Sequence, residues 1–90
     1  MTEKEILEYY GGKHQVIVAM EELAELIQQL SKSARGSDNR NEIVEEIADV
    51  QIMLEQMRIF FNISTAEIYD VMRLKLERET ERINERVNSM

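Results

Sequence analysis

Two acidic motifs contain the side chains of this 90-residue sequence that are most suited to chemistry. Glu-Glu-Leu-Ala-Glu occupies 21–25, and Glu-Ile-Ala-Asp occupies 46–49. Each motif has two carboxylates three residues apart, a spacing that places both on one side of a helix. Two such pairs facing each other across a helix–helix contact would gather the hard oxygen ligands that Mg²⁺ prefers.

The composition predicts one all-α domain over 1–90. The chain has no proline, three glycines, 43% apolar residues and 32% charged residues, a balance typical of an ordered helical domain. It has no cysteine, so disulfides and thiolate chemistry are excluded. The longest apolar run, Val16–Met20, is far too short to span a membrane, and no signal-peptide pattern opens the chain. The expectation is a soluble cytoplasmic protein without a membrane partner.

The charge argues against nucleic acid as a partner, because the net charge is −7 and nucleic-acid binding needs clustered cations. The same charge would repel a phosphate substrate unless a bound divalent cation and a local basic ridge offset it. Such a ridge is predicted at Lys75, Arg78 and Arg82, with Arg86 one turn further. Because glutamates are interleaved with them, simple surface ion pairs are an equal alternative for Arg82 and Arg86.

The apolar periodicity predicts three long helices preceded by a short one. The signals that begin or break them are Thr2 with Glu5, the glycine pair 11–12, Asn39 with Glu42, and Ser64 with Glu67. After the short helix, which ends before residue 11, the predicted long helices are 14–33, 40–61 and 64–87.

The first and third long helices each have one apolar stripe that we expect to form the core. The first stripe consists of Val16, Met20, Leu23, Ile27 and Leu30. The third helix carries Ile68, Met72, Leu76, Ile83 and Val87.

The second long helix is apolar on two sides, with Glu46 inside its main arc and Asp49 just beyond the edge. Burying an unpaired carboxylate costs roughly several kcal/mol, so Glu46 should be neutralised or paired. A helix that is apolar on two sides must be sandwiched, and three long helices alone leave little room for that. The sequence therefore predicts a bundle completed by self-association, as a homodimer or a homotetramer.

These motifs resemble the signature of the MazG-like all-α nucleoside triphosphate pyrophosphohydrolases. The resemblance covers about 14–82 and is closest to the short single-domain members from phages and Firmicutes. It includes His14-Gln15 before the first motif, Ser31-Lys32 after it, and Lys75-Leu76-Glu77-Arg78 near the end. It implies hydrolysis of a nucleoside triphosphate between its α- and β-phosphates, with Mg²⁺ as cofactor and Mn²⁺ as a substitute.

The resemblance also implies a role for each matching residue. The metal ligands would be Glu22, Glu25, Glu46 and Asp49. Glu21 would be a further ligand or a helper of the attacking water. Phosphate contacts would come from Lys32, Lys75 and Arg78, and sugar or base contacts from His14 and Gln15.

Two alternatives stay open at this point. The first is phosphoribosyl-ATP pyrophosphohydrolase, which shares the carboxylate arrangement and differs in substrate. The second is a non-catalytic helical oligomerisation module, in which Glu46 would pair with a Lys or Arg and no metal would be needed. A carboxylate-bridged di-iron bundle is set aside, because it would use Glu-x-x-His pairs and the only histidine lies at position 14.

Overall fold

A computed structural model describes residues 1–90 of the chain and contains four helices and no strand. They are α1 (Glu3–Tyr10), α2 (Gly12–Ala34), α3 (Arg40–Phe60) and α4 (Thr65–Ser89). The all-α class is confirmed, and the helix boundaries lie within two residues of the predicted ones. No helix is both long enough and apolar enough to cross a lipid bilayer.

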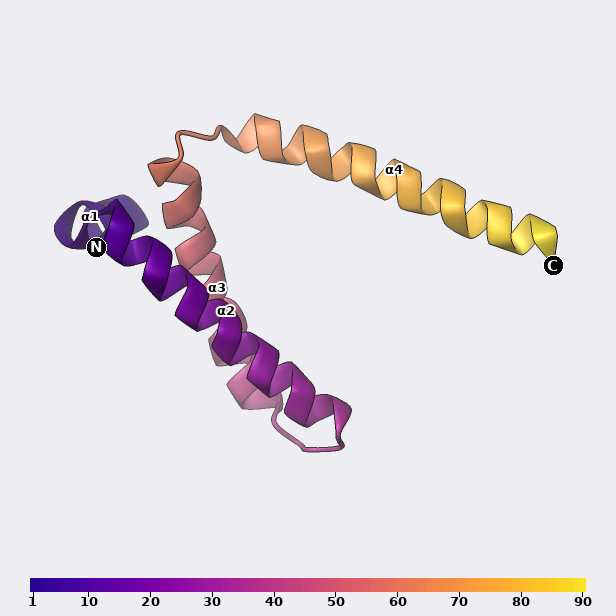
Figure 1. Ribbon diagram of the computed structural model, residues 1–90, viewed down its shortest axis with the longest axis horizontal. Coiled ribbons are helices and arrows are strands. Elements are labelled where there is room, and N and C mark those ends of the chain that lie inside the picture. The colour runs from indigo at the N-terminus through magenta and orange to yellow at the C-terminus, as the bar shows by residue number, and fades with distance from the viewer.

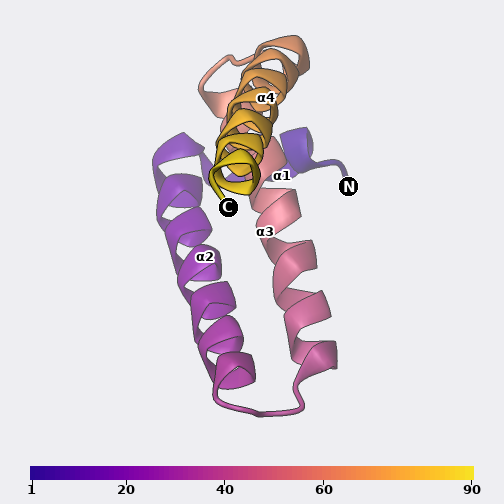
Figure 2. The same cartoon turned by 90° about the vertical axis from the view of Figure 1, so that its right-hand side faces the viewer.

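The packed body consists of the first three helices. In Figures 1 and 2, α2 and α3 run antiparallel as a hairpin, and α1 lies at the end where α2 begins and α3 finishes. α4 projects away from this body and has no buried residue. The expected bundle of three long helices is therefore not closed within one chain.

The α2–α3 contact uses a different side of α2 from the one that the sequence predicts. The residues that α2 buries are Gln15 and Ala19, whereas Met20 and Ile27 of the predicted stripe are 64% and 66% exposed. Small or amide side chains explain this choice. Ala19 lets the helices approach closely, and Gln15 Nε2 donates to the buried Gln56 Oε1 at 2.8 Å, so each of the two buried amides has the other as a partner.

One of the three predicted caps forms in full, one forms in part and one is wrong. Ser64 and Glu67 make a complete capping box at the start of α4. At α1, the Thr2 hydroxyl accepts from the Glu5 backbone N–H. Asn39 does not cap α3. Its Nδ2 instead donates to the backbone oxygen and the Oε1 of Gln29, at 2.9 and 2.7 Å, and ties the α2–α3 loop to α2.

The joint between α3 and α4 is fixed by one arginine. Arg58 pairs with Glu55 on its own helix and also donates from Nη1 to the backbone oxygen of Ile63 at 2.9 Å. The Ile63 N–H returns a bond to the Arg58 carbonyl oxygen at 2.9 Å. The turn between them contains Asn62 with a positive φ of 54°, a conformation that asparagine tolerates. These bonds set the direction in which α4 leaves the body.

The break between α1 and α2 depends on both glycines. Gly11 has φ 86° and ψ 152°, a region that is essentially restricted to glycine. Gly12 lies so close to the Phe60 ring that a methyl group there would overlap it. The predicted glycine break is thus confirmed, and it lets α1 fold back onto α3.

We expect Gly11→Ala to lower the free energy of unfolding by about 1–3 kcal/mol, because alanine would be strained at this backbone conformation. Urea unfolding followed by circular dichroism measures the change. Lys13→Ala, an exposed substitution in the first turn of α2, serves as the control. Equal stability of the two variants would contradict the strained geometry at Gly11.

Candidate metal centre

Three carboxylates converge between α2 and α3, and we call them the acidic cluster. They are Glu22 and Glu25 of α2 and Glu46 of α3, and one oxygen of each lies within 4.8 Å of the others. Glu22 and Glu25 are three residues apart and share one side of α2, as their spacing predicts. Glu46 reaches them from the first half of α3. The structure therefore brings together three of the four predicted metal ligands.

The inner carboxylates of the cluster have unsatisfied oxygens. Glu22 and Glu46 are half-buried, and the Oε2 atom of each is occluded from solvent with no hydrogen-bond donor. Glu25 is exposed and lies at the open side. Buried acceptors usually have a partner, so the orphaned oxygens on two members of one cluster indicate that a proton or a cation would stabilise it.

The electrostatics of the cluster favour bound protons. Desolvation, followed by the negative charges of Glu25 and Asp49, raises the pKa of Glu22 from its ordinary value of 4.5 to about 7. Desolvation and the charge of Glu25 also raise the pKa of Glu46. Carboxylates this close cannot all ionise freely without a compensating positive charge. A divalent cation would replace the shared protons and remove the repulsion.

Asp49 and Glu21 lie at the margin of the cluster. Asp49 is exposed and its oxygens are not among the converging ones, although its charge is felt by both Glu22 and Glu46. Glu21 is exposed and follows Met20 on the part of α2 that turns away from α3. Their predicted roles as ligand and as helper of the attacking water stay predictions.

The predicted phosphate contacts divide into two groups. Lys32 lies on α2 two turns beyond Glu25, which places it on the same side of the helix, and its side chain is exposed. Lys75 and Arg78 lie on α4, which projects away from the α2–α3 pair (Figure 1). Within one chain the structure does not bring these two cations to the acidic cluster.

The predicted sugar or base contacts are engaged in the body. Gln15 is buried, and its amide is bonded to Gln56. His14 is exposed, stacks on the Tyr10 ring with centroids 5.0 Å apart, and donates from Nδ1 to Gln15 Oε1 at 2.7 Å. Sequence reasoning did not single out Gln56, although an amide among the apolar residues of α3 is the signal that would have found it.

The arrangement suits the binding of a hard cation. Carboxylate oxygens from two rigid helices converge, and the exposed side at Glu25 leaves access for water and a ligand. No family model, curated protein or solved structure matches the chain. The family resemblance therefore stays an expectation from the sequence.

We predict that the metal-free protein becomes less stable as the pH rises from about 4.5 to about 7. Folding raises the pKa of Glu22, so the folded chain holds this proton more tightly than the unfolded chain does. The resulting stabilisation is complete below pH 4.5 and is lost as the pH passes 7. Urea midpoints measured in EDTA across this range test the prediction.

Glu22→Gln should flatten this pH profile, whereas Glu21→Gln, the exposed neighbour with the same change of charge, should keep it. At pH values above 7, millimolar Mg²⁺ should raise the urea midpoint of the wild type, because the cation takes the place of the lost protons. An unchanged slope in Glu22→Gln would show that the cluster does not control the stability.

Proposed function

We propose that this chain is a Mg²⁺-dependent nucleoside triphosphate pyrophosphohydrolase, which cleaves between the α- and β-phosphates and releases a nucleoside monophosphate and pyrophosphate. The observation that carries the proposal is that two members of the acidic cluster, Glu22 and Glu46, each have a buried oxygen without a hydrogen-bond donor. Neither oxygen has a donor from the protein, and a divalent cation is the simplest partner for both.

The residues of the cluster have the chemistry that such a cation needs. Glu22, Glu25 and Glu46 would hold it, with Asp49 at the exposed edge as a further ligand. When bound, Mg²⁺ would neutralise the phosphates, align them and lower the pKa of the attacking water. Four carboxylates carry more negative charge than one Mg²⁺ neutralises, so we expect a second ion to enter with the substrate.

Two further side chains of α2 would orient the substrate and take up the proton. Glu21 is exposed and precedes Glu22 in the sequence, and it is the candidate acceptor for the proton of the attacking water. Lys32, on the same side of α2 as Glu25, would contact the phosphates from within the chain. The net charge of −7 makes such local cations necessary for a polyanionic substrate.

The test follows pyrophosphate release from a panel of NTPs, dNTPs and phosphoribosyl-ATP in Mg²⁺. We expect release by the wild type, its loss in EDTA, and partial recovery in Mn²⁺. Glu25→Gln and Glu46→Gln should each lower the rate by about a hundredfold or more, because even outer-shell changes at metal sites cost 10–100-fold.

Glu45→Gln is the matched control, since it removes the same charge from the exposed residue before Glu46. We expect this variant to keep its activity. Release from phosphoribosyl-ATP alone would reassign the substrate to the first alternative. If no substrate is cleaved and Mg²⁺ leaves the thermal midpoint unchanged, the non-catalytic helical module replaces the hydrolase.

A further inference from the structure

The α2–α3 hairpin exposes one continuous apolar surface, which we call the apolar face. On each helix, viewed along its own axis from N- to C-terminus, the residues of this face are rotated in the same sense away from the side that contacts the other helix. Because both helices are right-handed and run antiparallel, these residues emerge on one side of the pair. The apolar face consists of Met20, Leu23, Ile27 and Leu30 of α2, Ile47 and Leu54 of α3, and Phe61, which directly follows α3. Each of these residues is 41–66% exposed. Glu25 and Asp49 are displaced in the opposite sense, so the acidic cluster opens on the other side.

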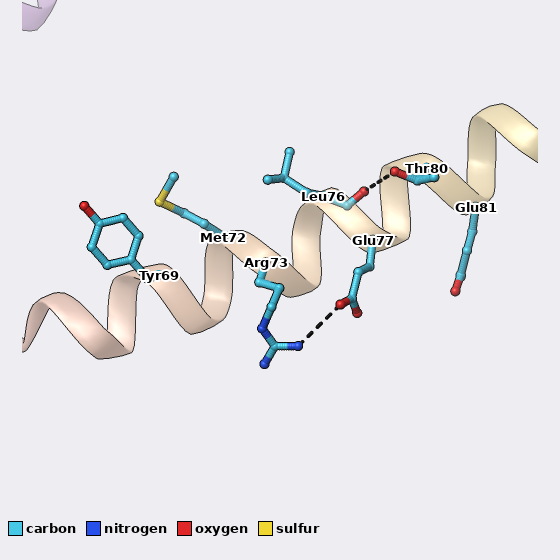
Figure 3. Close-up of a pocket in the computed structure, with 7 residues that line it drawn as sticks. All are labelled: Tyr69, Met72, Arg73, Leu76, Glu77, Thr80 and Glu81. Atoms are coloured by element: carbon cyan, nitrogen blue, oxygen red, sulfur yellow. Dashed lines mark hydrogen bonds and ion pairs between the residues drawn. The ribbon is translucent and has the colours of Figure 1, made fainter.

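α4 carries a second unpartnered apolar surface. Ile68, Met72, Leu76, Ile83 and Val87 recur at helical spacing, and each is 39–66% exposed. Figure 3 shows Tyr69, Met72 and Leu76 projecting from α4, beside an Arg73–Glu77 ion pair of the same helix. A helix of this composition in water has little to stabilise it apart from packing against a partner.

The two surfaces meet at the α3–α4 joint. A hollow of about 620 Å³ there is lined by Leu54, Met57 and Phe61 from the α3 side and by Ile68, Tyr69 and Met72 from α4. The apolar stripe of α4 is therefore continuous with the apolar face, and both border the same open angle. The bonds of Arg58 to Ile63 hold this angle.

The area left open is what a stable dimer needs. The chain exposes 7347 Å², whereas a folded monomer of 10.6 kDa is expected to expose about 5,500 Å². The excess, roughly 1,900 Å² per chain, exceeds the ~800 Å² that each partner buries in an ordinary stable interface and fits an obligate dimer. The radius of gyration, 17.0 Å, likewise exceeds the ~12 Å of a compact chain of this length.

We propose that a second copy of this chain covers the apolar face, and that the two copies exchange their α4 helices as arms. Each hairpin lies in the open angle between the other's apolar face and arm, so one association covers both exposed surfaces. A second copy is favoured because a two-fold symmetric dimer covers the apolar face and the α4 stripe of both chains at once. It also closes the core that the seven buried residues of one chain leave incomplete.

The exchange has a consequence for the acidic cluster, and this step rests on the proposed function. At 1.5 Å per residue, Lys75 and Arg78 lie about 15 and 20 Å along α4 from Thr65. Packed helix layers are about 8–10 Å apart, so an arm that crosses the partner hairpin carries these cations to the level of its far side. That far side is where the acidic cluster opens. Lys75 and Arg78 of one chain, which lie away from the acidic cluster of their own chain, would thus provide the phosphate contacts at the cluster of the other chain.

The first experiment uses the wild-type chain. Light scattering should give twice the monomer mass of 10.6 kDa, and the thermal midpoint should rise over about a hundredfold increase in protein concentration. A monomer mass at micromolar concentration would overturn the proposal.

Cross-linking tests the exchange itself, because the chain has only four lysines, at 4, 13, 32 and 75. A mixture of isotope-labelled and unlabelled chains should give mixed-label links between Lys75 and Lys13 or Lys32. A dimer whose Lys75 links are all within one chain would contradict the arm exchange.

Paired substitutions locate the interface. Ile27→Lys on the apolar face and Leu76→Lys on α4 should shift the protein towards monomer. Gln28→Lys and Asn84→Lys, exposed residues of the same helices outside the two apolar surfaces, should not. If both members of a pair behave alike, the proposed surface is wrong.

Complementation separates this inference from the proposed function. Glu46→Gln should be inactive because its acidic cluster lacks a carboxylate. The double variant Lys75→Gln, Arg78→Gln should be inactive because its α4 arm lacks the two cations. Equal amounts, unfolded and refolded together, should recover about a quarter of wild-type activity, because one site of each mixed dimer has a normal cluster and a normal arm. No recovery from an active wild type would overturn the delivery of these cations to the partner. If the wild type is inactive, the mass and cross-linking results still decide the exchange.

Discussion

Carboxylates that meet between two packed helices repel one another unless a proton or a cation lies among them. In this chain the constraint acts at the centre of the α2–α3 contact, where oxygens of Glu22, Glu25 and Glu46 converge within 4.8 Å. The other buried side chains of the two helices are Ala19 and the Gln15–Gln56 pair, together with the apolar Val50 and Met53 of α3. The contact between the helices is therefore partly polar, and we expect its stability to depend on what occupies the cluster.

The polar residues of this contact leave apolar residues of α2 uncovered. Because amides and carboxylates occupy much of the side of α2 that meets α3, Met20 and Ile27 of α2 stay exposed, whereas α3 buries Val50 and Met53. A single chain then has a charged side, a partly polar interior contact and an uncovered apolar side. The division gives the acidic cluster access to water from one direction and leaves the other direction open, so the proposed ligand binding and the proposed assembly would use opposite sides of the same two helices.

Periodicity and capping residues were sufficient to predict the four helices, the glycine break and the convergence of three carboxylates. They could not predict which side of α2 meets α3. An apolar stripe such as the one that includes Ile27 predicts a surface that is buried, but it does not indicate which helix or which chain covers that surface. Asn39 was predicted as a cap from its position alone, but the neighbouring Gln29 offers it two acceptors. The distance of Lys75 and Arg78 from the cluster was also beyond sequence reasoning, because it depends on the angle at which α4 leaves α3.

That angle has a further consequence for the size of the assembly. Two chains that exchange arms reciprocally use every arm and every apolar face, so the assembly is closed. If the turn at Asn62 released α4 in another direction, an arm could reach a third chain instead, and each addition would leave one arm and one face free. The result would be an open-ended filament. In the proposed dimer, the Arg58 bonds across this turn would thus separate a finite particle from a polymer, although they lie far from the acidic cluster.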